Sequence, residues 1–370
     1  MKIIILNFIL STPINGKIIS RESNCDTMIY NMARGFSSLG HEVTLLASEE
    51  YKPLKPEKND FKVVYFSSRF KPIFKPTLLP YPKGLVSFLK KETAEVDMVL
   101  AIETFSIPTL IASLICPKKM LIWQEVGVYQ RMAFKIPAKL WCHVVARLTM
   151  SRIPIVAMSP GARSFAEKFM RRVSRQTVAH GADEKVFYPS QEPPGDYFIV
   201  VSMLVARKRI DSIIGIFARY VEKYDKATEN LVIVGEGPEE RNLKALVADL
   251  GVSGRVEFKG FLSHSRMNEY ERRAKALVVN TASDLNMVSV TEAIANGTPV
   301  LMNTVPTTSA FVSQYCLGIA KNGWDEDDMK AMSDNYDNYH SNCVSQRQRF
   351  TNTGVAGLLC SLFHQSHPVG

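Results

Sequence analysis

Residues 276–300 read ALVVNTASDLNMVSVTEAIANGTPV, and this stretch indicates the kind of fold that the chain adopts. An apolar run typical of a buried strand leads into a polar loop that carries Asp284. A helix is predicted from Val288 to a stop at Gly297, because glycine commonly ends helices. A second short apolar run follows at 299–302. Strand, helix and strand in this order predict a right-handed βαβ unit around a parallel sheet.

The same alternation runs through the chain. Apolar runs rich in Ile and Val predict strands near residues 2–10, 42–47, 62–66, 97–102, 119–124, 153–158, 176–179, 197–203, 230–235, 255–258, 276–280 and 299–302. The stretches between them predict helices near residues 26–39, 84–93, 105–115, 135–149, 160–171, 209–223, 238–250, 264–274 and 288–296. A Pro-rich stretch at 189–195 interrupts the pattern, which then starts again. The sequence therefore predicts an α/β protein of two doubly wound, Rossmann-like domains that meet at about 190–195.

The composition is that of a folded protein. Of the 370 residues, 46% are hydrophobic and 22% charged, which excludes collagen-like and disordered classes. Six scattered cysteines show neither a disulfide framework nor zinc-ligand spacing, so we expect a reducing compartment. The basic, apolar start at 1–10 raises the alternative of a signal peptide, but its length and the absence of a small-residue cleavage site favour a buried strand. No apolar stretch approaches the roughly 20 residues of a spanning helix.

Charge is divided unevenly along the chain. Residues 1–190 carry 27 basic and 15 acidic side chains, whereas residues 191–370 carry 18 and 21. This excess favours an anionic partner for the first half, such as a membrane surface. The segment 69–83 interleaves aromatics, prolines and lysines, which is typical of an irregular surface loop and, as the alternative, predicts contact with lipid headgroups. Segments 131–152 and 163–175 add basic residues, and nucleic acid is not expected because no nucleic-acid module is recognised.

The loop and helix start within 276–300 combine an anion site with two carboxylates. Backbone N–H groups of Met287, Val288 and Ser289 are predicted at a helix N-terminus, where unsatisfied donors and the helix dipole favour phosphate. Asp284 lies on the loop and Glu292 one turn into the helix, so both can accept hydrogen bonds from sugar hydroxyls. Spacing alone favours the alternative that both carboxylates are solvated surface groups.

This stretch resembles the signature of retaining glycosyltransferases of family 4, which have the two-domain GT-B fold. The resemblance implies that Glu292 holds the ribose of a nucleotide and that Asp284, an Asp where the family has Glu, contacts the transferred sugar. It also implies an acceptor-binding domain at 1–190, a nucleotide-sugar-binding domain at 191–345 and a last segment at 346–370 that packs back on the first domain.

Other stretches match the family in order and spacing. Lys208 matches a lysine that neutralises the leaving diphosphate, while Met203 replaces the family's arginine, so Arg207 or Arg209 would have to supply that charge.

The glycines Gly235 and Gly237 match a turn after a strand, and the resemblance implies contact between the nucleotide base and the backbone near Val256. A tight strand-to-helix turn with no ligand is the alternative for this Gly-x-Gly.

Three residues of the first half are further site candidates by resemblance. His180 occupies a position where the family has Asn or His, which makes it a candidate for the lining of the donor site. Gln124 stands where many members have a His beside the reacting sugar, so it is expected to hydrogen-bond to the acceptor. Glu125 follows it and is a candidate base or acceptor contact. A satisfied strand end under a loop is the alternative for Gln124 and Glu125.

The resemblance implies retaining transfer of a hexose from a nucleotide sugar to a glycan or lipid-linked acceptor, in cell-surface polysaccharide or glycolipid synthesis. The nucleotide sugar is a substrate, with a UDP-sugar favoured over a GDP-sugar, and no cofactor or essential metal is expected. We expect a cytoplasmic protein, peripheral on the inner face of the membrane. The alternatives are a weakened relative that binds nucleotide without turnover and a GT-B phosphorylase or epimerase.

Overall fold

The computed structural model describes residues 1–11, 13, 16–129, 136–284 and 287–367. It divides into two compact units, which are Met1–Gly181 with Asn352–Gly370, and Ala182–Thr351. Residues 131–135 of the basic segment 131–152 lie outside the described residues.

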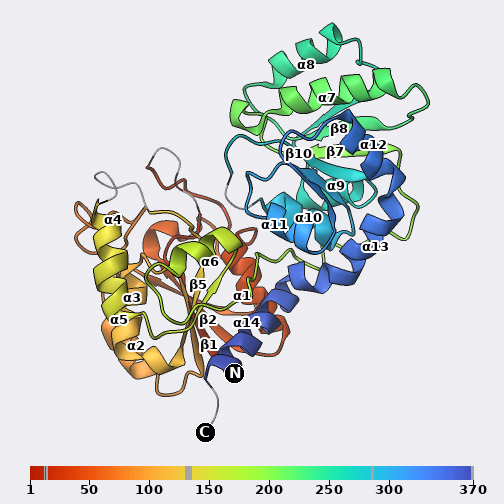
Figure 1. Cartoon of the computed structure of the whole chain (residues 1–370). Helices are drawn as coiled ribbons and strands as arrows, with labels where there is room; N and C mark the ends of the chain where they lie inside the picture. Colours follow the sequence, from red (N-terminus) through yellow and green to blue (C-terminus); the bar gives the residue numbers. More distant parts are fainter. Residues whose placement is uncertain (12, 14–15, 130–135, 285–286, 368–370) are drawn as a thin grey trace. The chain divides into compact units, whose positions relative to one another are not determined.

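The first unit is a parallel sheet between two layers of helices (Figure 1). Among the described residues its six strands lie in the order β3-β2-β1-β4-β5-β6. They are β1 Lys2–Leu6, β2 Glu42–Ser48, β3 Lys62–Phe66, β4 Met98–Ile102, β5 Met120–Gln124 and β6 Ile155–Ala157. The helices are α1 Met28–Ser38, α2 Leu85–Glu92, α3 Ile107–Ile115, α4 Ile136–Leu140, the π-helix Trp141–Ala146, α5 Arg147–Thr149, α6 Pro160–Ala166 and α14 Asn352–Ser366, with 3₁₀ turns at Glu49–Tyr51 and Pro117–Lys119.

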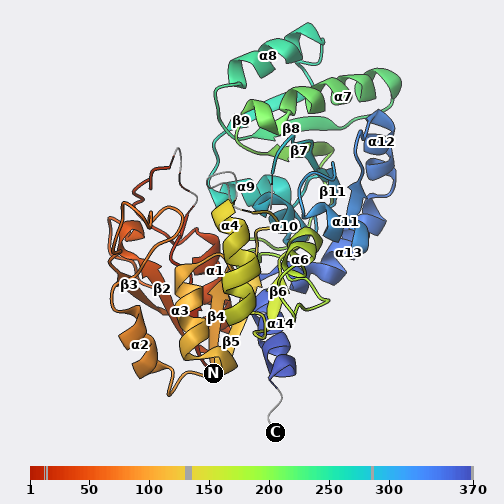
Figure 2. The ribbon, with the colours of Figure 1, turned by 60° about the vertical axis from the view of Figure 1, so that its left-hand side comes forward.

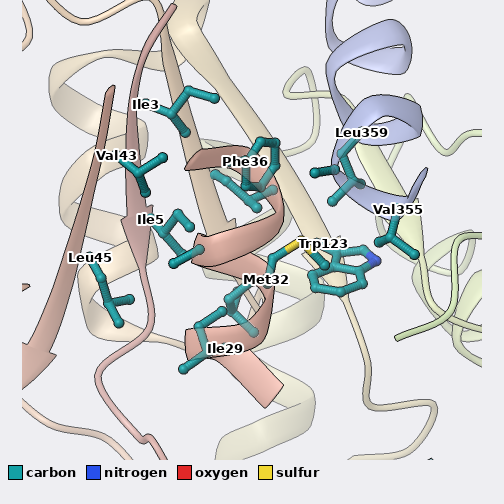
Figure 3. Packing of buried hydrophobic residues seen from close by; sticks show 14 of the residues in the cluster. Ile3, Ile5, Ile29, Met32, Phe36, Val43, Leu45, Trp123, Val355 and Leu359 are labelled. Carbon is teal, nitrogen blue, oxygen red and sulfur yellow. The ribbon is translucent and has the colours of Figure 1, made fainter. Parts of the chain in front are cut away.

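The run Ile3 to Leu6 is apolar throughout because both faces of the sheet are covered. Ile3 and Ile5 pack against α1 and α14, whereas Ile4 and Leu6 pack on the opposite side against α2, α3 and the π-helix. Figure 3 shows the first of these layers, where Phe36 of α1 and Leu359 of α14 lie near Trp123 of β5. The alternation of side chains along β1 therefore assigns each residue to one of two cores.

Helix α14 lies directly on α1 (Figure 1). The close approach requires glycine, because a Cβ on Gly35 would lie 2.4 Å from the backbone oxygen of Asn352. The last segment, expected from residue 346, joins the first unit only from Asn352 onward. Residues 182–190, assigned by sequence to the first domain, belong to the second unit, where Ala182 donates to the carbonyl of Phe350.

The second unit repeats this architecture with the strand order β12-β11-β10-β7-β8-β9 in the described chain. Its strands are β7 Tyr197–Val201, β8 Asn230–Val234, β9 Val256–Gly260, β10 Ala276–Val279, β11 Val300–Met302 and β12 Gly318–Ala320. Its helices are α7 Ile210–Lys223, α8 Glu240–Asp249, α9 His264–Glu271, α10 Val288–Ala295, α11 Ser309–Gln314, α12 Glu326–Asp334 and α13 Tyr336–Gln346, with 3₁₀ turns at Ala206–Lys208 and Arg347–Phe350. The predicted pair of doubly wound domains is confirmed.

The order of strands reverses between β7 and β10 in the second sheet, and between β1 and β4 in the first. In doubly wound sheets, ligands bind at this switch point, beyond the carboxyl ends of the strands. The loops that follow β7 and β10 are therefore where a site in the second unit is expected.

Two parts of the sequence prediction need correction. No strand forms at 176–179, where Val178 donates a single hydrogen bond to Ala157 beside the edge strand β6. The sequence pattern also did not reveal β12 or the helices α11, α12, α13 and α14. The start of α12 could have been predicted from the sequence, because Asp325 and Asp328 have the spacing of a capping box and form one in the structure.

Candidate functional site

Two basic residues after β7 meet one carboxylate after β10. The Lys208 ammonium and the Arg207 guanidinium both contact Asp284 Oδ2, the latter at 3.1 Å. The side chains of Lys208 and Asp284 are mostly buried, with 12% and 17% exposed, whereas that of Arg207 is 49% exposed. Burial reduces the screening of these charges by water, so the cluster attracts an anion more strongly than surface lysines would.

Hydrogen bonds to backbone carbonyls fix the two loops to each other. The carbonyl of Arg207 accepts bonds from the amide of Ala282 at 2.7 Å and from the hydroxyl of Thr281 at 3.1 Å. In return, the Arg207 guanidinium donates to the carbonyl of Ser283 at 2.9 Å. Because β7 and β10 are neighbours in the sheet, these bonds hold Asp284 near the two cations.

Helix α10 begins at Val288 as predicted, with Met287 as its N-cap residue. In the part of the chain that the structure describes, no side chain caps this helix. The N–H groups of Met287, Val288 and Ser289 thus stand at its amino end, where the helix dipole adds positive potential. Met287 itself is buried and Val288 is 45% exposed.

The two glycines of the Gly-x-Gly turn let the loop after β8 approach the loop after β7. Gly235 has φ +133°, and a Cβ there would lie 1.8 Å from the carbonyl oxygen of Ser202. A Cβ on Gly237 would lie 2.2 Å from the carbonyl oxygen of Leu204. Both glycines therefore have a structural role in shaping the edge of the sheet that holds Lys208.

Gly235→Ala is expected to lower the free energy of unfolding by about 3 kcal/mol or more, because the methyl group overlaps a backbone oxygen and the φ disfavours L-residues. Urea unfolding measures this loss. The matched control is Gly254→Ala, where no atom lies within 4 Å of the added Cβ. An equal loss of unfolding free energy in the two variants would contradict the close approach of Gly235 to Ser202.

The structure corrects the expectation for Val256. This residue begins β9 and pairs with Leu231, whereas the carboxyl end of the strand is Gly260, opposite Val234. Val256 therefore lies at the amino edge of the sheet, away from the glycine turn. The backbone of Gly260 and Phe261, rather than that of Val256, lies at the carboxyl edge of the sheet beside the glycine turn. Gly235 donates to the carbonyl of Gly260, and Phe261 donates to the Glu236 carboxylate at 3.2 Å.

Glu292 is buried in α10 rather than solvated, since only 8% of its surface is exposed. Its neighbour is Glu271 at the end of α9, which is fully buried and accepts a bond from the Asn296 amide at 2.9 Å. Burial raises the pKa of both carboxyls, and the charge of Glu292 raises the pKa of Glu271 further. Ionisation of both carboxyl groups at the same time is therefore unfavourable.

Glu271→Gln is expected to raise the melting temperature at pH 8 by about 2–4 °C, with little change at pH 5. The folded protein keeps protons on this pair that the unfolded chain releases, so stability falls as pH rises through the raised pKa values. The neutral amide removes one ionisation and still accepts the Asn296 bond. Melting curves from pH 5 to 8 test this, with the exposed Glu269→Gln as control. A loss of stability at both pH values would contradict it.

In the first unit, Gln124 and Glu125 are joined by a residue that the sequence analysis missed. The Glu103 carboxylate, at the end of β4, accepts bonds from the amides of Glu125 and Val126 at 2.7 and 2.8 Å and from the Gln124 side chain. Gln124 also accepts from Thr104 through Oε1. The available signal was an acidic residue directly after an apolar strand.

Glu103 has two features of a functional residue. Its φ is +70°, a left-handed conformation that is rare for residues other than glycine. Burial raises its pKa to about 8, and the charge of Glu125 contributes. The carboxyl group can therefore gain or lose a proton near neutral pH.

His180 completes this cluster. Its Nε2 lies 3.3 Å from Glu125 Oε1, and its ring packs edge-on against Trp123. Its buried Nδ1 has no hydrogen-bond partner within the described residues. The structure thus brings six of the predicted site residues together in two groups. Gln124, Glu125 and His180 meet with Glu103 in the first unit, and Arg207, Lys208 and Asp284 meet in the second. Across the described ranges, no group of three or more His, Cys, Asp or Glu side chains could hold a metal ion.

Part of the chain matches a known family of proteins. Residues 184–351 match the family model of glycosyl transferases group 1. The α-monoglucosyldiacylglycerol synthase of Streptococcus pneumoniae is 26% identical over 118 residues, which are 32% of this chain and 26% of that protein. The lipopolysaccharide core biosynthesis glycosyltransferase LpsE of Rhizobium meliloti is 33% identical over 112 residues, 30% of this chain and 31% of LpsE. The matches therefore span only about a quarter to a third of these curated relatives.

Solved structures show that the fold of the whole chain is GT-B. The lipopolysaccharide outer core galactosyltransferase WaaB superposes with a TM-score of 0.66 at 16% identity, over 99% of both chains. HepE of Anabaena, solved in complex with UDP, superposes with a TM-score of 0.66 at 12% identity, over 99% of this chain and 100% of HepE. At these identities the likeness concerns the fold alone.

Proposed function

We propose that the protein is a retaining glycosyltransferase that moves a hexose from a UDP-sugar to a glycan or lipid-linked acceptor in cell-surface polysaccharide or glycolipid synthesis. The observation that carries this proposal is the pair of cations, Lys208 and Arg207, held at the switch point of the second sheet. A nucleoside diphosphate leaving group needs cations there, because negative charge develops on it as the glycosidic bond breaks. The family match of residues 184–351 supports the same class of reaction.

In this proposal the diphosphate takes the place that Asp284 now occupies on the two cations. A diphosphate bears more negative charge in total than a carboxylate, and the N-terminus of α10 adds N–H donors on the same side of the sheet. Asp284 is then available to accept hydrogen bonds from the transferred sugar, and Glu292 from the ribose. With Lys208 and Arg207 as the neutralising groups, the reaction would need no metal.

The first unit would supply the acceptor side of the reaction. Glu125 is proposed to hydrogen-bond to the attacking hydroxyl, while Glu103 fixes its backbone. Gln124 is buried, and its amide group is already bonded to Glu103, Thr104 and Val126, so the alternative of a satisfied strand end fits this residue better than a contact with the acceptor. His180 is proposed to line the donor site. In front-face attack, the leaving phosphate accepts the proton of the acceptor hydroxyl, so no protein base is required.

UDP is the proposed nucleotide because HepE, which shares the fold, was solved with UDP. A lipid-linked or lipopolysaccharide acceptor is supported by the names of the relatives, a diacylglycerol glucosyl synthase and a lipopolysaccharide core enzyme. All six cysteines are free, which supports a reducing compartment such as the cytoplasm.

Incubation with a panel of UDP- and GDP-sugars, with and without EDTA, tests the proposal. Slow release of UDP from one UDP-sugar, unchanged by EDTA, is expected. Binding of nucleotide without turnover would instead indicate a non-catalytic relative. The observation that favours this alternative is Met203, an exposed residue that stands where the family has an arginine. Phosphate-dependent release of sugar would indicate a phosphorylase. An acceptor screen by mass spectrometry, with NMR of the product anomer, then identifies the acceptor and tests retention.

A further inference from the structure

One helical segment of the first unit carries its large aliphatic side chains on the outside. Helix α4, the π-helix Trp141–Ala146 and α5 follow one another without a break from residue 136 to 149. Its exposed aliphatic side chains are Ile136, Leu140, Val144 and Leu148, with exposed fractions of 64%, 60%, 44% and 79%. We call these four residues the outer stripe. Figure 2 shows α4 at the front of the first unit.

The inner face of the same segment is built from small residues. Ala138, Cys142 and Ala146 are at most 2% exposed, and Cys142 and Ala146 pack in the core that contains α2 and α3. A surface helix normally turns its large apolar side chains inward. The outer stripe therefore does not stabilise the fold by burial in the core. A continuous exposed apolar face of this kind marks an interaction surface.

The π-helical turn helps to keep the stripe straight. Residues spaced by four drift around an α-helix, because 3.6 residues complete a turn. A π-helix takes more residues for each turn, so the wider turn between Leu140 and Val144 reduces this drift. The backbone irregularity thus aligns the four side chains, and π-helical turns of this kind are frequent at functional sites.

Charge identifies the kind of partner. Between Glu125 and Glu167 the sequence has no Asp or Glu but six basic residues. Lys139 and Arg147, each next to a stripe residue in sequence, lie on exposed parts of this segment. The first unit as a whole carries 26 Lys and Arg against 13 Asp and Glu. An apolar stripe flanked by basic residues is the pattern of a helix that lies in the interface of an anionic bilayer.

We propose that the outer stripe inserts into the headgroup region of an anionic lipid bilayer, with Lys139 and Arg147 on lipid phosphates. A second copy of the chain is a poorer occupant, because two such basic faces repel each other. No described helix is both long and apolar enough to cross a membrane, so binding would be peripheral. The inference concerns a partner of the acceptor-side unit and does not depend on sugar transfer.

The segment 69–83, from which the sequence predicted lipid contact, is less suited to this role. Lys71 forms an ion pair with Glu50 at 3.0 Å, and the rings of Phe70 and Phe74 pack on Tyr81. Its charge and aromatic surface are therefore partly used within the fold, although Phe70 remains exposed.

Flotation with vesicles of phosphatidylcholine and phosphatidylglycerol at about 3:1, at low salt and without nucleotide, tests the proposal. The wild-type protein is expected to float. The double variant Leu140→Gln/Leu148→Gln should lower the partition coefficient at least about tenfold. Lys139→Gln/Arg147→Gln should lower it by about fivefold per charge and reduce its dependence on salt.

The matched control is Leu54→Gln, since Leu54 is 69% exposed on the loop after β2 and outside the stripe. It should float as the wild type does, and so should Lys71→Gln/Lys75→Gln. Circular dichroism and calorimetric titration with UDP verify that each variant is folded. Absence of flotation by the wild type, or equal flotation of the stripe variant, overturns the proposal while leaving the proposed sugar transfer untouched. A dimer that Leu140→Gln dissociates would assign the stripe to a second copy instead.

Discussion

Lys208→Ala is expected to lower turnover of the nucleotide sugar by at least one to two orders of magnitude, with the fold intact. The ammonium is mostly buried beside Asp284, so its charge acts on a bound diphosphate with little screening. Affinity for UDP should fall about tenfold as well, because a hydrogen bond to a charged group contributes about 1.5 to 3 kcal/mol. Steady-state kinetics and calorimetric titration with UDP measure the two effects.

Lys223→Ala is the matched control for this experiment. Lys223 also pairs with a carboxylate, that of Asp327, in the same unit, but it lies at the opposite end of α7 from Lys208. This variant should retain full turnover. If Lys208→Ala also retained it, Lys208 would not belong to the site, and the cation pair would no longer support a nucleotide-sugar enzyme.

Glu292→Gln and Asp284→Asn are expected to fail in different ways. Glu292 is proposed to hold the ribose, so its amide variant should weaken binding of bare UDP about tenfold or more. Asp284 is proposed to touch only the transferred sugar, so Asp284→Asn should leave UDP affinity unchanged or raise it, because it removes an anion that competes for Lys208 and Arg207. Its turnover should nevertheless fall about tenfold or more.

Calorimetric titration with UDP and with the UDP-sugar separates these outcomes. Both variants keep a hydrogen-bonding side chain of nearly the same shape, so a change in melting temperature would reveal any structural contribution. If Asp284→Asn abolished UDP binding and Glu292→Gln did not, the two roles would be reversed and the family resemblance across this loop would be misaligned.

The sequence was sufficient for much of the fold because strands buried on both faces need continuous apolar runs. The runs at Lys62–Phe66 and at 119–124 are examples, and the helix that begins at Val288 starts after the predicted loop and ends before Gly297. Short elements escaped this reasoning. The strand Gly318–Ala320 has three residues, too few to show any periodicity, and forms only because β11 offers it an edge.

The amino-acid sequence alone was enough to place charged and hydrogen-bonding groups at the ends of strands. Both the identity of a residue and the apolar pattern of a strand are local properties of the sequence. Asp284 was identified in this way, and Lys208 and Glu125 were identified by the family resemblance of their stretches. Tertiary structure alone decided which of them meet. Lys208 and Asp284 are 76 residues apart and touch because β7 and β10 are neighbours at the switch point. Val256 was misplaced because the direction of β9 in the sheet sets which end faces the site, and Glu103 and Glu271 gained raised pKa values through burial that residue spacing does not encode.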